Sequence, residues 1–194
     1  MAEIDTAPDG KPMLTVADAD DLGQWLDGEH TRPSGVWLVR PRPGSAVPVV
    51  DYEDMIEVLL CYGWIDAVIK TLDEQRSLLW ISPRRKGSVW SKPNKTRVER
   101  LLAQGRLRPA GQAVIDRAQA DGSWTLIDGA ENLEVPDDLA AALAGVPGAR
   151  ENFDAYPPSV RKVFLAGIAM AKTAATRDRR IGAAVAKAAA NERP

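Results

Sequence analysis

The first half of the chain alternates between stretches of apolar residues at helical spacing and short runs of β-forming residues. The pattern predicts helices over 18–26 and 52–62, a strand over 35–40, and a hairpin of strands over 64–72 and 77–82. Asp51 is suited to cap the second helix, and Gly63 is suited to stop it. Three prolines and a glycine make regular structure impossible over 41–48.

The second half of the chain carries helical spacing almost throughout. A polar, basic loop from Pro83 leads into a helix that runs to about Gln104, with Ser91 or Asn94 as its N-cap. Further helices are predicted over 109–121, 136–145, 158–172 and 176–190, and residues 123–135 are expected to form a loop. Pro109 and Pro136 suit first helical positions, and Thr176 suits an N-cap.

Three early strands followed by mostly helices predict an α+β fold rather than alternating βαβ units. We expect a small antiparallel sheet in the N-terminal half and a mainly helical C-terminal half. The domain organisation that follows is a flexible tail over 1–14, an α+β core over 15–130, and a helical extension over 131–194 packed on the core.

Composition excludes several kinds of chemistry. Among 194 residues there is one cysteine, Cys61, and one histidine, His30. A disulfide framework is thereby excluded, and neither a structural zinc site nor any other metal or cofactor is expected. No apolar run reaches about 18 residues, so no membrane span is predicted. The N-terminus lacks the features of a secretory signal, and a cytoplasmic location is expected.

The formal net charge of −2 conceals two regions of opposite sign. Residues 1–31 hold eight acidic residues and one basic residue, whereas residues 84–117 hold ten basic and two acidic residues. Such a concentration of positive charge can steer an anionic partner. The alternative is a solvated basic face that pairs with the acidic N-terminal part.

A candidate anion-binding cleft lies around the first third of this basic block. Three consecutive bases precede Gly87, which lets the backbone approach a ligand, and two hydroxyl groups follow near a predicted helix start. Tryptophans supply flat apolar walls, and Asp66 could orient an arginine for bidentate binding. The candidate residues are Trp64, Asp66, Arg84, Arg85, Lys86, Ser88, Trp90, Ser91, Asn94 and Arg97.

Each of these residues also has a structural interpretation. Trp64 and Trp90 could be core aromatics, and Asp66 could form a buried structural pair with an arginine. Ser91 could be a simple helix cap. Cys61, near the end of an apolar helix, is expected to behave as a small hydrophobic residue.

Four motifs carry a resemblance to a known family. They are CYGWID at 61–66, SPRRKGSVWS at 82–91, the segment NKTRVERLLAQGRLRPAG at 94–111, and AKTAATRDRRI at 171–181. Over roughly residues 20–190 the sequence resembles the YdeI/OmpD-associated family, also described as bacteriocin-protection proteins. Two positions depart from the family pattern: Ala67 stands where glycine is usual, and Arg108 stands where threonine would cap a helix. The resemblance implies a role in stress or antimicrobial-compound protection.

Three functions remain open from the sequence. The first is binding of a small anionic ligand or a protein partner at the basic-aromatic cleft. The second is an enzyme acting on a phosphate- or carboxylate-bearing substrate, with Arg84 and Arg85 as a clamp and Asp66 as acid or base. The third is nucleic-acid binding, which an overall pI near 5.5 disfavours.

Overall fold

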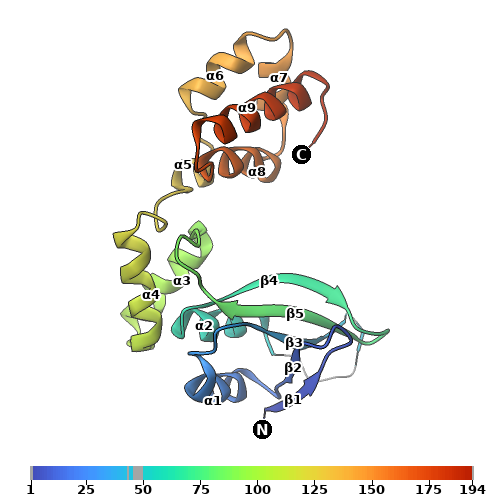
Figure 1. Ribbon diagram of the computed structural model, residues 1–194, viewed down its shortest axis with the longest axis vertical. Coiled ribbons are helices and arrows are strands. Elements are labelled where there is room, and N and C mark those ends of the chain that lie inside the picture. Colours follow the sequence, from blue (N-terminus) through green and yellow to red (C-terminus); the bar gives the residue numbers. More distant parts are fainter. Residues whose placement is uncertain (1, 43, 46–49, 194) are drawn as a thin grey trace. The chain divides into compact units, whose positions relative to one another are not determined.

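The structure is a computed structural model that describes residues 2–42, 44–45 and 50–193 (Figure 1). The chain divides into two compact units. The first comprises Met1–Ser88 and Pro93–Asp121, and the second comprises Val89–Lys92 and Gly122–Pro194. The boundary expected at residue 130 therefore falls inside the second unit. Residues 43 and 46–48 of the predicted irregular segment lie outside the described residues.

A five-stranded mixed sheet organises the first unit. Its strands are β1 (Glu3–Thr6), β2 (Pro12–Thr15), β3 (Val36–Pro41), β4 (Trp64–Thr71) and β5 (Arg76–Pro83), in the order β1-β2-β3-β5-β4. The predicted strand and hairpin are confirmed as β3, β4 and β5. The sheet is not wholly antiparallel, because β2 pairs with β3 in parallel.

The expected flexible tail forms the first two strands instead. In the turn between them, the Asp9 carboxylate accepts hydrogen bonds from Trp37 Nε1 at 3.0 Å and Lys70 Nζ at 2.8 Å. Met13 of β2 is buried in a cluster with Trp37 and Leu78. Contacts with residues far along the chain therefore order a segment whose own sequence carries little strand signal.

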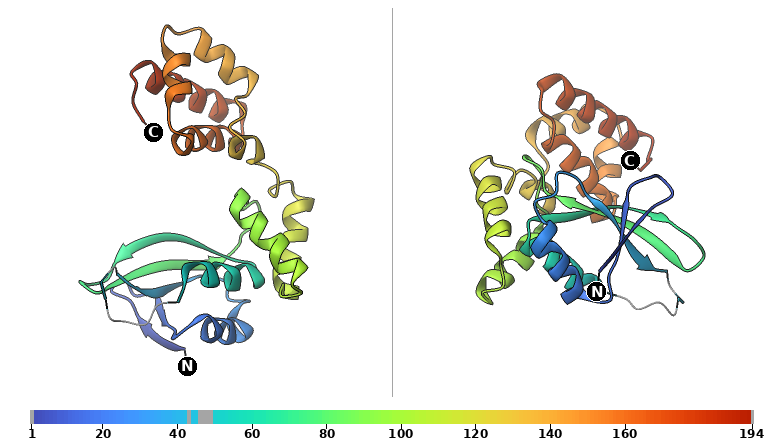
Figure 2. Two further views of the ribbon diagram at one scale, coloured as in Figure 1. Left: turned by 180° about the vertical axis from the view of Figure 1, so that it is seen from behind. Right: turned by 60° about the horizontal axis from the view of Figure 1, so that its bottom comes forward.

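Two helices, α1 (Ala19–Glu29) and α2 (Tyr52–Cys61), lie side by side against the sheet, as Figure 2 shows from two further directions. Asp18 caps α1 by accepting from the amide of Asp21. The prediction that Asp51 caps α2 is confirmed, since its carboxylate accepts from the amides of Glu53 and Asp54. Leucines of both helices are buried, and they join the strands in forming the core of this unit.

Two further helices, α3 (Lys92–Ala103) and α4 (Pro109–Ala120), follow the hairpin. Asn94 lies within the first turns of α3, so it does not cap that helix as one alternative had it. Pro109 begins α4 as predicted, and Arg108 stands at the N-cap without a capping side-chain hydrogen bond. The loss of a cap expected from the unusual Arg108 is therefore confirmed.

The second unit is helical. It holds α5 (Asp128–Glu131), α6 (Asp137–Ala144), α7 (Ala149–Ala155), α8 (Pro158–Ala169) and α9 (Ala174–Ala189), arranged around their own buried cluster. The expected loop over 123–135 contains the short α5, and α7 was not predicted. Thr173 rather than Thr176 caps α9, by accepting from the amide of Thr176.

The mixed sheet and the helical second half confirm the α+β class. Within the described part of the chain, no helix has the length and apolar character that crossing a membrane requires.

Candidate functional site

The two tryptophans of the predicted cleft are buried. Trp64 is fully buried, donates from Nε1 to the carbonyl of His30 at 3.0 Å, and meets Trp25 edge-on. Trp90 is also buried and belongs to the second unit, where its ring centroid lies 4.8 Å from that of Trp124. The expectation that both offer open walls to a ligand is wrong, and their interpretation as core aromatics is confirmed.

Several polar residues of the predicted cleft bind one another or neighbouring helices. Arg97 donates to Glu53 at 2.9 Å and to the side-chain oxygen of Asn94 at 3.1 Å. Asp66 accepts from the hydroxyl of Tyr52 at 3.2 Å. These contacts fasten α3 and β4 to α2. They give Arg97, Asn94 and Asp66 a structural role that needs no ligand.

The triple base splits into one buried and two exposed residues. Arg84 is buried, and burial lowers its pKa to about 10 while the charge of Asp66 acts in the opposite direction. Arg85 and Lys86 are exposed, and they precede a turn in which the amide of Gly87 donates to Asp121 at 3.2 Å. Ser88 and Ser91 are half-buried and fall in different units. Anion binding by Arg85 and Lys86 therefore stays a prediction.

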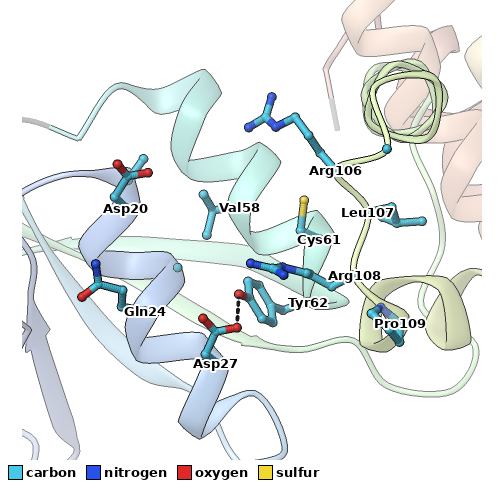
Figure 3. A pocket seen from close by; sticks show the side chains of 13 residues that line it. Asp20, Gln24, Asp27, Val58, Cys61, Tyr62, Arg106, Leu107, Arg108 and Pro109 are labelled. Carbon is cyan, nitrogen blue, oxygen red and sulfur yellow. Dashed lines mark hydrogen bonds between the residues drawn. The ribbon is translucent and has the colours of Figure 1, made fainter.

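A pocket of about 610 Å³ lies elsewhere in the first unit, between α1, the end of α2 and the connection from α3 to α4 (Figure 3). Sequence reasoning did not select it. It is lined by Ala19, Asp20, Gly23, Gln24 and Asp27 of α1, by Val58, Cys61 and Tyr62, and by Gly105, Arg106, Leu107, Arg108 and Pro109.

Local sequence explains how two of these segments reach the pocket. Gly63 adopts a left-handed φ of 73° and ends α2 just after Tyr62. At Gly111 of α4, an added Cβ would lie 2.4 Å from the carbonyl oxygen of Cys61. Only glycine allows α4 to approach the end of α2 this closely, and that approach holds Arg108 beside Tyr62.

The centre of the pocket is a tyrosine bound to a carboxylate. The hydroxyl of Tyr62 donates to Asp27 at 2.6 Å, which joins α2 to α1 (Figure 3). Burial and this hydrogen bond raise the pKa of Tyr62 to about 12. The phenol is therefore neutral near pH 7 and acts as a hydrogen-bond donor, while its ring is largely buried.

The two arginines of the pocket differ in their existing partners. Arg106 donates to Glu57 at 2.6 Å and to Gln104 at 3.2 Å, and buried Glu57 also pairs with Arg100. The guanidinium of Arg108 lies 6.0 Å from the centroid of the Tyr62 ring. Among the described residues, no carboxylate forms an ion pair with Arg108, so its charge is available to a ligand.

Cys61 contributes a thiol to the same pocket. The side chain is only 7% exposed, and burial raises its pKa. The sulfur lies on the pocket side of α2 (Figure 3). A neutral, buried thiol is a poor nucleophile and forms a small apolar part of the wall, as the sequence predicted.

Across the residues that the structure describes, His, Cys, Asp and Glu side chains nowhere gather in threes as metal ligands would. The pocket therefore offers a basic wall of Arg106 and Arg108, an aromatic ring, a thiol, and carboxylates on α1. This arrangement can bind charged small molecules through hydrogen bonds and ion pairs.

Comparison with known families divides the chain in two. Residues 14–114 match the model of a domain of unknown function (DUF8412), and residues 132–191 match the model described as Bacteriocin-protection, YdeI or OmpD-Associated. The motifs at 61–66, 82–91 and 94–111 thus lie in the first match, and the motif at 171–181 lies in the second. No curated protein and no solved structure matches the chain.

Proposed function

Since the chain belongs to the DUF8412 domain family and continues into a YdeI/OmpD-associated domain, we propose that its first unit binds a small anionic ligand in the pocket of α1, α2 and the α3–α4 connection. The observation that carries the proposal is Arg108: its guanidinium lines the pocket beside the ring of Tyr62 and takes part in no ion pair with the described carboxylates.

The surroundings of Arg108 favour an anion. Arg106 adds a second positive charge, which Glu57 holds in place. Pro109, the first residue of α4, also lines the pocket, so the positive end of that helix lies at the site. A volume of about 610 Å³ is in the range of small-molecule sites.

The proposed site still lies in the basic block of residues 84–117, but at a different position from the cleft that the sequence predicted. Arg106 and Arg108 stand in the second half of residues 84–117, whereas the predicted cleft was centred on Arg84, Arg85 and Lys86. Tyr62 lines this pocket but is largely buried, so it forms part of the wall and not an open stacking face. Arg85 is exposed and absent from the pocket lining, and it provides a matched control for Arg108.

The test is ligand binding by two arginine variants. Butanoate and inorganic phosphate are titrated into the full chain by calorimetry and in thermal denaturation, where a ligand of the native state raises the melting temperature. We expect binding to the wild type and to Arg85→Met, and loss of at least about tenfold in affinity in Arg108→Met, the size of one charge-assisted contact. Loss in Arg85→Met alone would place the site at the basic loop, and absence of binding by the wild type would refute the proposal.

The family description of the second domain suggests ligands to test beyond butanoate and inorganic phosphate. It names bacteriocin protection, and antimicrobial compounds with an acidic group are therefore the physiological candidates that we propose, bound in the cytoplasm. A protein partner, an enzymatic role for Asp66 and nucleic-acid binding stay predictions from the sequence.

A further inference from the structure

The pocket has an acidic side that anion binding does not explain. Asp20, Gln24 and Asp27 stand four and three positions apart on α1, and this spacing puts them on one face of the helix. Figure 3 shows Asp20 at one end of the pocket, with the guanidinium of Arg108 reaching from the α3–α4 connection toward Tyr62 and Asp27. The two sides, at Asp20 and at Arg108, therefore carry opposite charge.

Both acidic side chains retain capacity for a ligand. Asp20 is exposed, and among the described residues it forms no ion pair. Asp27 accepts one hydrogen bond, from Tyr62. A carboxylate has about four lone-pair sites, so Asp27 can accept a further donor without releasing the tyrosine.

Between the two charged sides the lining is apolar. Val58 and Cys61 of α2 contribute this surface (Figure 3). A molecule bound from Asp20 to Arg108 would therefore meet a carboxylate at one end, apolar side chains in the middle and a guanidinium at the other end.

We infer that the ligand of this pocket is a small zwitterion, with a carboxylate toward Arg108, an ammonium group toward Asp20, and an apolar segment between them. The inference rests on the proposed function and specifies its ligand class. A purely anionic ligand would be repelled by the α1 carboxylates, and a purely cationic one by Arg106 and Arg108. A zwitterion satisfies both sides at once.

A series of three compounds with the same four-carbon chain tests this class: 4-aminobutanoate, butanoate and butylamine. Affinities are measured by calorimetry on the full chain. For the wild type we expect 4-aminobutanoate to bind at least about tenfold more tightly than butanoate, as one added ion pair in a partly enclosed site would give. Butylamine should bind more weakly than either.

Asp20→Asn is the diagnostic variant, and Asp54→Asn is its matched control. Both residues are acidic side chains in the first turn of a helix, so both substitutions remove the same favourable interaction with a helix dipole. Only Asp20 lines the pocket. We expect Asp20→Asn to bring 4-aminobutanoate down to the affinity of butanoate, and Asp54→Asn to leave the difference unchanged.

The outcomes separate this inference from the proposed function. Equal affinities for butanoate and 4-aminobutanoate, both lost in Arg108→Met, would overturn the zwitterion and leave anion binding intact. The inference would also be overturned if Asp20→Asn still bound 4-aminobutanoate more tightly than butanoate by the same factor as the wild type. Binding of butylamine as tight as that of 4-aminobutanoate, or binding of none of the three, would refute both.

Discussion

Tyr62, at the end of α2, donates its hydroxyl hydrogen to Asp27 of α1 at 2.6 Å, and this single contact joins two helices across the floor of the pocket. The same ring lies near the guanidinium of Arg108. The packing of α1 on α2 and the shape of the candidate site are therefore linked by a hydrogen bond between residues that are distant in sequence.

Removing the hydroxyl with Tyr62→Phe should destabilise the protein by about 1.5–3 kcal/mol, the usual range for a hydrogen bond to a charged group. The effect is measured as the free energy of unfolding in urea. Tyr52→Phe is the control, because the hydroxyl of Tyr52 meets Asp66 at 3.2 Å on an exposed side chain and should contribute less. A cost for Tyr52→Phe equal to that for Tyr62→Phe would contradict this account.

The pKa of Tyr62 predicts a loss of stability at high pH. Its pKa is raised to about 12 in the folded protein from the ordinary tyrosine value of 10.0. The neutral phenol therefore contributes stability that is complete below pH 10 and is lost as the pH rises toward 12. Absorbance of the phenolate should show one tyrosine that titrates near pH 12. That titration should be missing in Tyr62→Phe, and its persistence in this variant would assign it to another tyrosine.

Asp9 predicts the opposite dependence at low pH. Lys70 is the main cause that lowers the pKa of Asp9 from 3.8 to about 2, and Trp37 adds a second hydrogen bond. The ionised carboxylate thus contributes stability that is present above about pH 4 and is lost as the pH falls through 2. The difference in stability between wild type and Asp9→Asn should shrink over this interval.

Lys70→Met is the second variant for the Asp9 contact. It should reduce the same acid dependence, because it removes the ammonium group that Asp9 binds. An unchanged slope of stability against pH in both variants would show that the turn between β1 and β2 does not need this ion pair.

The approach of α4 to α2 predicts an unusual cost for a small substitution. Gly111→Ala should destabilise the protein by about 1–3 kcal/mol, because the new methyl group would overlap the carbonyl oxygen of Cys61 and push the helices apart. Gly23→Ala is a matched change within α1, where the nearest atom, of Val58, is 4.0 Å away. We expect it to be neutral or stabilising, since alanine favours helix. In thermal denaturation, Gly111→Ala should lower the melting temperature, whereas Gly23→Ala should leave it unchanged or raise it.

Local features of the sequence were sufficient for much of the fold. Asp51, Gly63 and Pro109 each act on a neighbouring turn, and the elements that they start or stop were predicted correctly. The first two strands were missed because they are four residues long and depend on contacts such as Asp9 with Lys70. The helix α7 was missed because it is short and Gly148 begins it without a capping side chain.

The site was predicted less well than the fold, for a related reason. The pocket takes its lining from three separate segments, 19–27, 58–62 and 105–109, and no single motif contains them. Composition placed Arg108 in a basic block, but only the tertiary structure brings it next to Tyr62. One feature could have indicated the site: Arg108 stands where the family pattern has a helix-capping residue, which is a costly exchange unless the side chain has another use.

Alkylation of Cys61 by iodoacetamide tests the central claim most directly. Cys61 is the only cysteine in the chain and lines the pocket. Because its thiol is buried and neutral, alkylation is slow and requires the pocket to open, so it is followed over long times with excess reagent. The account predicts that butanoate at ten times its dissociation constant slows alkylation by about tenfold in the wild type. In Arg108→Met the same concentration should have no effect. A rate that does not change when butanoate binds the wild type, or that falls equally in Arg108→Met, would contradict anion binding at this pocket.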